Sequence, residues 1–206
     1  TLFRSHIICT PEQLEDEFRG VIELINYMMA TLGIENDISY RFSKWDPANT
    51  EKYINDPEAW ERTEGLMRNI LDHLQINYEE AVGEAAFYGP KLDIQFKNVH
   101  GKEDTIITVQ IDFALGERLG MTYIDADGEK KHPLIIHRTS IGCYERTLAM
   151  LIEKYAGQFP IWLAPVAVKV LPLSDKYADY VAEVVKAFKD RGILKVEADY
   201  RTEKIG

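Results

Sequence analysis

Four short segments contain residue types that could do chemistry, and the richest of them runs from Ile136 to Arg146. His137 stands at the end of a predicted apolar strand, a Thr-Ser-Ile-Gly turn is predicted to follow, and Arg146 stands near the start of a predicted helix. An imidazole can bind a metal ion, while the free N–H groups of a helix N-terminus and a guanidinium both favour phosphate. This combination indicates a nucleotide enzyme, although a lone histidine at a strand end is more often structural.

Three further places offer polar groups on or beside predicted strands. A Gly-Pro pair bends the chain so that Tyr88 and Lys91 can point together. Gln110 and Asp112 alternate along an apolar strand and so lie on one face, where they can form the floor of a polar site. His6 precedes the apolar run Ile-Ile-Cys. These patterns also suit a surface turn, a half-exposed strand and a solvated or core histidine, and no histidine spacing announces a metal site.

Composition restricts the class of protein. The chain has 206 residues, of which 46% are hydrophobic and 28% charged, which is typical of a globular protein. No apolar run approaches the ~20 residues of a membrane helix, no signal-peptide pattern opens the chain, and two cysteines, Cys9 and Cys143, suit a reducing cytosol. The net charge of −10 argues against a compact nucleic-acid-binding module, but not against an enzyme that meets RNA through a local patch.

The elements that must position these residues follow from periodicity. Helical spacing of apolar residues predicts helices from Thr10 to Gly33, from Asp56 onward and at about 141–156, and alternation predicts a strand at 37–43. Short strands joined by tight turns then predict an antiparallel meander, because parallel strands need long crossover connections. The strands of this meander are predicted at about 84–88, 91–98, 105–114, 120–125 and 131–137.

After the long helix the pattern changes. Two apolar runs at 166–171 and 194–198 flank a predicted helix at 176–191, which together form one βαβ unit. Such a unit implies a parallel strand pair in a separate sheet. We therefore expect one domain in residues 1–160 and another that begins in residues 161–206. Both ends of the chain fall close to predicted strands, so we expect it to be an internal part of a longer protein.

Taken in order, the motifs resemble those of the threonyl-tRNA synthetases. They are His-Ile-Ile-Cys-Thr-Pro-Glu-Gln, Gly-Glu-Ala-Ala-Phe-Tyr-Gly-Pro-Lys, Thr-Val-Gln-Ile-Asp-Phe, His-Arg-Thr-Ser-Ile-Gly-Cys-Tyr-Glu-Arg and Phe-Pro-Ile-Trp-Leu-Ala-Pro-Val. The resemblance covers nearly the whole chain from His6 onward. The third signature motif of class II aminoacyl-tRNA synthetases, a Gly-x-x-x-Glu-Arg that ends on a helix, maps onto Gly142 to Arg146.

This resemblance implies an α+β fold, in which residues 1–160 form a class II synthetase antiparallel sheet flanked by helices. Residues 161–206 would be the truncated start of an α/β anticodon-binding domain. The implied reaction is ATP-dependent activation of threonine and its transfer to tRNA(Thr) by the parent enzyme. That enzyme is expected to be a cytoplasmic homodimer that does not bind membranes.

The resemblance also implies roles for particular residues. His6 and His137 would be two of three protein ligands of a Zn²⁺ ion, the third being a cysteine upstream of this sequence. An open zinc position can bind the amine and hydroxyl of threonine together, which valine cannot match. Arg146 would contact the phosphates of ATP, which is bound with Mg²⁺. The threonine and adenylate pocket would be lined by Tyr88, Lys91 and Gln110.

The sequence departs from the family at several places. Arg4 and Ser5 stand where an acidic pair is usual, Thr105 stands where glutamine is common, and Cys143 where serine is common. The family's first motif and the ATP-binding arginine of its second motif are missing, so we expect the 206-residue chain alone to be inactive. Two alternatives stay open: another class II synthetase, prolyl or histidyl, and a non-catalytic binding protein derived from a synthetase.

Overall fold

The computed structural model describes residues 2–201, with side chains from Arg4 onward. By its contacts the chain divides into two compact units, Thr1–Met150 and Leu151–Gly206, and each has a sheet of its own. Within residues 2–201, no helix is both long and apolar enough to span a membrane.

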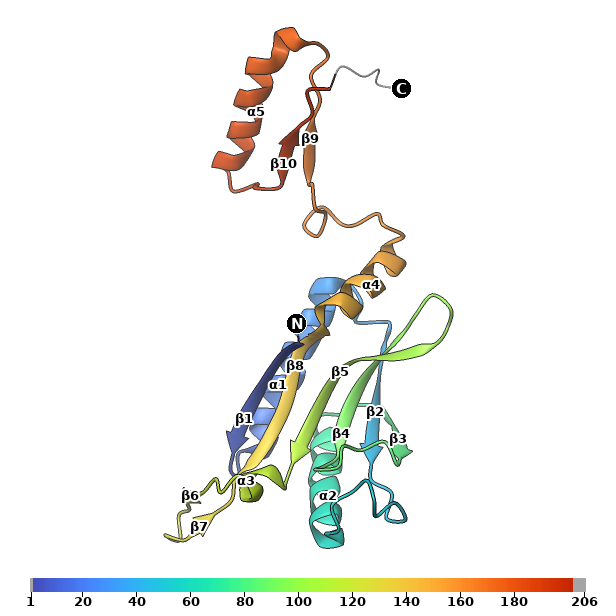
Figure 1. Ribbon diagram of the computed structural model, residues 1–206, viewed down its shortest axis with the longest axis vertical. Coiled ribbons are helices and arrows are strands. Elements are labelled where there is room, and N and C mark those ends of the chain that lie inside the picture. The colour runs from blue at the N-terminus through green and yellow to red at the C-terminus, as the bar shows by residue number, and fades with distance from the viewer. Residues whose placement is uncertain (1, 202–206) are drawn as a thin grey trace. The chain divides into compact units, whose positions relative to one another are not determined.

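A six-stranded sheet forms the centre of the first unit (Figure 1). Its strands are β1 (Leu2–Cys9), β2 (Ile38–Lys44), β3 (Tyr78–Val82), β4 (Lys91–Lys97), β5 (Glu103–Asp112) and β8 (Leu134–Cys143). They stand in the order β1-β8-β5-β4-β2-β3, and every neighbouring pair is antiparallel except β2 and β3. The implied α+β fold is confirmed, with one parallel edge strand that the meander did not include.

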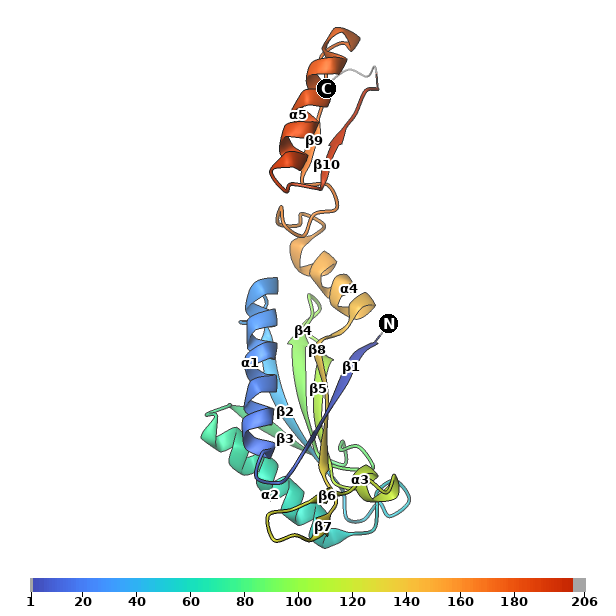
Figure 2. The same ribbon diagram turned by 90° about the vertical axis from the view of Figure 1, so that its left-hand side faces the viewer.

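Two amphipathic helices, α1 (Leu14–Leu32) and α2 (Pro57–His73), lie on one side of this sheet (Figure 2). Each buries a stripe of apolar side chains that recur every three or four residues. Phe18 and Trp60 from the helices and Phe42 from β2 are fully buried, and each such side chain stabilises the fold by roughly 1.5–3 kcal/mol. The opposite face of the sheet is therefore the one available to polar residues.

The two helix starts differ in how well the sequence predicted them. The carboxylate of Asp56 accepts a backbone N–H of the first turn of α2 at 3.0 Å, so this start is confirmed. Helix α1 begins three residues later than predicted, after a turn. The backbone N–H of Thr10 donates to Gln13 Oε1 at 3.1 Å, which is half of the predicted capping box. Gly33, with φ of 69°, ends α1 as predicted.

The segment 84–88 is a turn, so the strand predicted there was wrong. The N–H groups of Gly83 and Ala85 both donate to the carbonyl of Lys44, at 2.9 and 3.1 Å. Two donors that converge on one carbonyl end the β2–β3 ladder and bend the chain away from it. The residues that follow are thereby free to form a loop beside the sheet.

The strands predicted at 120–125 and 131–137 are also arranged differently. After the short helix α3 (Leu115–Arg118), β6 (Tyr123–Ile124) and β7 (Lys130–Lys131) form a small hairpin outside the six-stranded sheet. The Asp-Ala-Asp-Gly sequence between them makes the predicted turn. The strand that carries His137 begins only at Leu134.

Strand β8 continues through the Thr-Ser-Ile-Gly sequence, where a turn was predicted, and helix α4 (Tyr144–Tyr155) follows at once. The prediction failed because β1 pairs with this stretch and keeps it extended, with Arg4 opposite Thr139. Gly142 has φ of +78°, and a Cβ there would lie 1.9 Å from the carbonyl oxygen of Ile106. A glycine is therefore required for this close approach of β8 to β5.

The second unit contains the predicted βαβ arrangement. Strand β9 (Val168–Val170) leads through a 3₁₀ turn, Asp175–Tyr177, to helix α5 (Ala178–Asp190) and then to strand β10 (Val196–Ala198). The two strands pair in parallel, so the parallel pair in a separate sheet is confirmed.

Candidate active site

Five polar residues form a single row across the sheet, one on each of five neighbouring strands. His6 lies opposite His137, His137 opposite Gln110, Gln110 opposite Lys91, and Lys91 opposite Ser43. Directly opposed residues in antiparallel strands project to the same face. The sheet thus brings four of the residues predicted for the site into one line, on the face away from α1 and α2.

A second polar row lies two residues farther along the strands. Asp93 of β4 stands opposite Arg41 of β2 on one side and Thr108 of β5 on the other. Arg4 of β1 stands opposite Thr139 of β8 at the far end of the sheet. These rows give the floor of the site several hydrogen-bonding groups. Arg41 and Lys91 are paired with carboxylates, Arg41 with Glu103 and Lys91 with Asp93.

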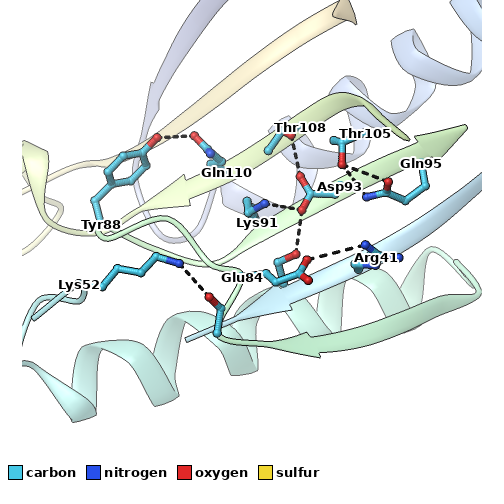
Figure 3. Close-up of polar contacts among 12 residues, drawn as sticks. Arg41, Lys52, Glu84, Tyr88, Lys91, Asp93, Gln95, Thr105, Thr108 and Gln110 are labelled. Carbon is cyan, nitrogen blue, oxygen red and sulfur yellow. Dashed lines mark hydrogen bonds and ion pairs between the residues drawn. The ribbon is translucent and has the colours of Figure 1, made fainter. Parts of the chain in front are cut away.

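Tyr88 enters the site from the loop between β3 and β4. Its hydroxyl donates to Gln110 Oε1 (Figure 3). Its ring centroid lies 5.0 Å from that of His137. Burial raises the pKa of the Tyr88 phenol above its ordinary value, so the neutral hydroxyl is a donor at neutral pH. Lys52 Nζ holds the start of this loop by donating to the carbonyl of Gly83 at 2.8 Å.

A glycine beside Tyr88 lets the loop lie directly on β5. A Cβ on Gly89 would lie 1.8 Å from the carbonyl oxygen of Ile111. Backbone bonds on either side fix the loop there, from Ile111 N to the Pro90 carbonyl at 3.1 Å and from Phe113 N to the Tyr88 carbonyl at 3.3 Å. The position of the tyrosine therefore depends on the absence of a side chain at the next residue.

Lys91 is held by a buried carboxylate. Asp93 is 1% exposed and accepts hydrogen bonds from Lys91 Nζ at 2.5 Å, Ser43 Oγ at 2.8 Å and Thr108 Oγ1 at 2.7 Å (Figure 3). A buried charge is tolerated when it is paired and its hydrogen bonds are satisfied. The ammonium group, on a side chain that is 20% exposed, is thereby fixed next to Gln110.

The two histidines lie edge to face, with ring centroids 4.7 Å apart. His137 is buried, and its Nε2 lies 2.8 Å from Asp112 Oδ2. Its Nδ1 is buried and has no hydrogen-bond partner among the described residues. Partial desolvation, and then the nearby His137 and Arg4, lower the pKa of His6 below the usual imidazole value, which favours its neutral form.

These properties fit two ligands of one metal ion. A neutral imidazole with an unused buried nitrogen is what a metal ligand requires. Within the described part of the chain, no group of three or more His, Cys, Asp or Glu side chains is arranged to hold a metal. The two histidines present therefore fit the expected pair of ligands.

Arg146 lies in the first turn of α4, and its Nη1 donates to the carbonyl of Thr105 at 2.6 Å. A cavity of about 160 Å³ joins it to the polar rows of the sheet. Its walls include Arg4, Gln110, His137 and Arg146. His137 and Arg146, the two residues predicted for the site in the segment from Ile136 to Arg146, thus line one cavity.

A larger hollow of about 420 Å³ lies elsewhere in the unit, lined by residues such as Trp45, Tyr53 and Glu64. It contains none of the residues predicted for the site. Its polar groups include carboxylates, and burial raises the pKa of Glu64 above its ordinary value. The smaller cavity, which combines imidazole, amide and guanidinium groups, is therefore the better candidate for binding an anionic substrate.

Two residues that matter for the geometry were not among the predicted site residues. Asp93 holds Lys91, and strand alternation could have indicated it, because residues two apart share a face. Asp112 was expected on the face of Gln110, and it does reach the ring of His137. Its partner could not be identified from the sequence, because that partner lies on a different strand.

Comparisons with known proteins identify the family of the chain. The family profile described as tRNA synthetase class II core domain (G, H, P, S and T) matches residues 3–155. A threonine–tRNA ligase of Clostridium perfringens is 73% identical over all 206 residues, and one of Geobacillus kaustophilus is 48% identical. The chain spans about a third of the length of these relatives, 32% and 31% respectively.

Solved structures extend the likeness to the fold. The RNA-binding domain of threonyl-tRNA synthetase from Cryptosporidium parvum has a TM-score of 0.86 and 30% identity, over 98% of this chain and 49% of that one. A prolyl-tRNA synthetase from the same organism shares the fold alone, with a TM-score of 0.60 and 14% identity over 98% of this chain and 36% of that one. The resemblance indicated by the sequence motifs is confirmed, and the chain belongs to the class II tRNA synthetase core-domain family (G, H, P, S and T).

Proposed function

We propose that the protein to which this chain belongs is a threonine–tRNA ligase, which activates threonine with ATP and transfers it to tRNA(Thr). The observation that carries the proposal is the row of His6, His137, Gln110 and Lys91 on one face of the sheet. Arg146 lines the same cavity as His137 and Gln110. The 73% identity to a relative named threonine–tRNA ligase supports the choice of amino acid.

In this proposal the residues bind and orient rather than react. In activation an oxygen of the threonine carboxylate bonds to the α-phosphorus of ATP while the bond from that phosphorus to the β-phosphate oxygen breaks, which gives threonyl-adenylate and releases pyrophosphate. Such a transfer depends on alignment and on stabilised charge. The guanidinium of Arg146 binds ATP phosphate, which enters with its Mg²⁺. The ammonium of Lys91 provides a fixed positive charge, while Tyr88 and Gln110 form a hydrogen-bonded wall for the amino acid and its adenylate.

His6 and His137 would hold a zinc ion together with a cysteine from elsewhere in the protein. Such an ion would supply a Lewis acid for the amine and hydroxyl of threonine, so that valine, which lacks the hydroxyl, would be disfavoured. The unpartnered Nδ1 of His137 and the 4.7 Å between the two rings support this assignment.

Threonine-dependent exchange of pyrophosphate into ATP by the full-length protein tests the proposal. Exchange that needs threonine is the expected result, whereas exchange with proline or histidine instead of threonine would identify a different synthetase. A non-catalytic binding protein would give no exchange with any amino acid. It would also show no ATP binding by calorimetry.

We further propose that residues 161–206 begin an anticodon-binding domain and that the full-length protein is a cytoplasmic homodimer. The parallel βαβ arrangement of the second unit supports the first part. A variant of the full-length protein that is truncated after residue 160 should retain threonine-dependent exchange and lose most charging of tRNA(Thr).

A further inference from the structure

Asp112 is the most completely enclosed charged residue beside the histidine pair. It is the last residue of β5 and is 0% exposed. Its Oδ1 accepts the backbone N–H groups of Ala114 at 2.9 Å and Leu115 at 2.8 Å, and its Oδ2 lies 2.8 Å from Nε2 of His137. Both carboxylate oxygens are therefore occupied, and the side chain has no freedom to rotate without losing a bond.

This arrangement determines which nitrogen of His137 carries the proton. A carboxylate can only accept hydrogen bonds, so the Nε2 that faces it must be the N–H donor. In the neutral ring the other nitrogen, Nδ1, then has a lone pair. That Nδ1 is buried without a hydrogen-bond partner among the described residues, and the ring that carries it lies edge to face with the ring of His6.

We propose that Asp112 is a positioning residue for the metal site. By accepting the proton-bearing Nε2 it fixes both the tautomer and the ring orientation of His137, and it thereby presents Nδ1 as a metal ligand. Carboxylates that hold the outer nitrogen of a ligating histidine contribute to metal affinity in this way. The inference rests on the proposed function, because His137 must be a metal ligand for its tautomer to matter.

A purely local role for Asp112 is the main competing explanation. The two bonds from Ala114 and Leu115 to Oδ1 form a turn that leads into α3, and this turn alone would account for a buried aspartate. The local role makes no use of Oδ2. An experiment that changes Oδ2 alone therefore separates the two explanations.

The substitution Asp112→Asn does this with almost no change of shape. The single oxygen of asparagine must stay at the two backbone N–H groups, because the reversed orientation would place its NH₂ against two donors. Its NH₂ then faces Nε2 of His137 and donates to it. The ring is forced into the opposite tautomer, with the proton on Nδ1, where it cannot bind a metal.

Two measurements test this. Proton–nitrogen correlation spectra of the metal-free 206-residue chain at neutral pH should give Nε2–H for His137 in the wild type and Nδ1–H in Asp112→Asn. In the full-length protein, the same substitution should weaken zinc binding by about 10- to 100-fold, measured by competition with a chelator. Asp93→Asn is the matched control, since Asp93 is equally buried on the same sheet but bonds Lys91 in place of the histidine.

The outcomes separate the inference from the proposed function. Nδ1–H in the wild type, an unchanged tautomer in Asp112→Asn, or an equal loss of zinc in Asp93→Asn would each overturn the positioning role alone. If Asp112→Asn does not fold, the wild-type tautomer still decides. A wild-type full-length protein that binds no zinc while the tautomer changes as expected would overturn the metal site itself, and the inference with it.

Discussion

Replacing Gly89 by alanine should displace Tyr88 from the site. The added Cβ would lie 1.8 Å from the carbonyl oxygen of Ile111, whereas ordinary Cβ contacts begin near 3.4 Å. The loop must therefore move by about 1.6 Å, the difference between these two distances. Gly89 does not have a positive φ, so the substitution adds no backbone strain of its own. Its effect comes only from the collision with β5.

The size of the effect follows from the bonds that hold the loop on β5. Moving the loop breaks the hydrogen bonds from Ile111 N to Pro90 and from Phe113 N to Tyr88, each worth about 1 kcal/mol net. We expect the free energy of unfolding of the first unit to fall by about 2 kcal/mol. Misplacement by about an ångström typically costs ~100-fold in rate, so threonine-dependent exchange should fall by about that factor.

Urea unfolding of the 206-residue chain measures the predicted change in the free energy of unfolding. Tryptophan fluorescence in a Trp162→Phe background reports the first unit alone, through Trp45 and Trp60. Gly128→Ala is the matched control, in the β6–β7 hairpin outside the six-stranded sheet. Its φ is +81° and its Cβ would meet nothing within 4 Å, so the substitution adds only backbone strain of about 1–2 kcal/mol. A Gly89→Ala protein as stable as wild type, with unchanged exchange, would refute the reasoning.

Three further predictions follow from other contacts. Asp93→Asn removes the counter-charge of Lys91 and should destabilise the first unit by about 2–3 kcal/mol in urea unfolding. This loss is smaller than the ~3–5 kcal/mol for breaking a fully buried ion pair, because the Lys91 side chain is 20% exposed. A loss under about 0.5 kcal/mol would contradict the prediction. Burial raises the pKa of the Cys9 thiol to about 11 from 9.0, so the unfolded state releases this proton at a lower pH than the folded state does. The free energy of unfolding of wild type, relative to that of Cys9→Ala, should therefore fall by up to about 3 kcal/mol between pH 9 and 11. A difference between the two proteins that does not change with pH would contradict this prediction. The 206-residue chain alone should charge tRNA(Thr) little or not at all, and measurable charging would refute that expectation.

Local chemistry made part of the fold predictable from the sequence. The helix that starts at Asp56 and the one that ends at Gly33 were predicted because a capping carboxylate and a left-handed glycine act within a few residues. The extended Thr-Ser-Ile-Gly stretch was mispredicted as a turn because its conformation depends on pairing with β1, far away in the sequence. Likewise, the parallel β3 reaches its place through α2, a connection that periodicity does not reveal.

The site, like the fold, combines features that local sequence predicts with features that depend on distant strand pairing. His137 and Arg146 share one short segment, and the type and spacing of residues there were enough to suggest their roles. The pairing of His137 with His6 depends on the register of β1 against β8, which no local pattern specifies. It entered the predictions only through resemblance to a family. Asp112 was expected on the face of Gln110, but its bond to His137 became evident only in the three-dimensional structure.

The alignment of the row of polar residues across the sheet depends on the register between neighbouring strands. Neighbouring strands lie about 4.8 Å apart, so the row across five strands is roughly 19 Å long. Backbone pairing sets this spacing, and side-chain substitutions do not change it. A slip of β5 by one residue would replace Gln110 in the row by Val109 or Ile111, whose side chains lie in the core. An insertion or deletion within β5 itself should therefore disrupt the row, because every residue beyond it would change face.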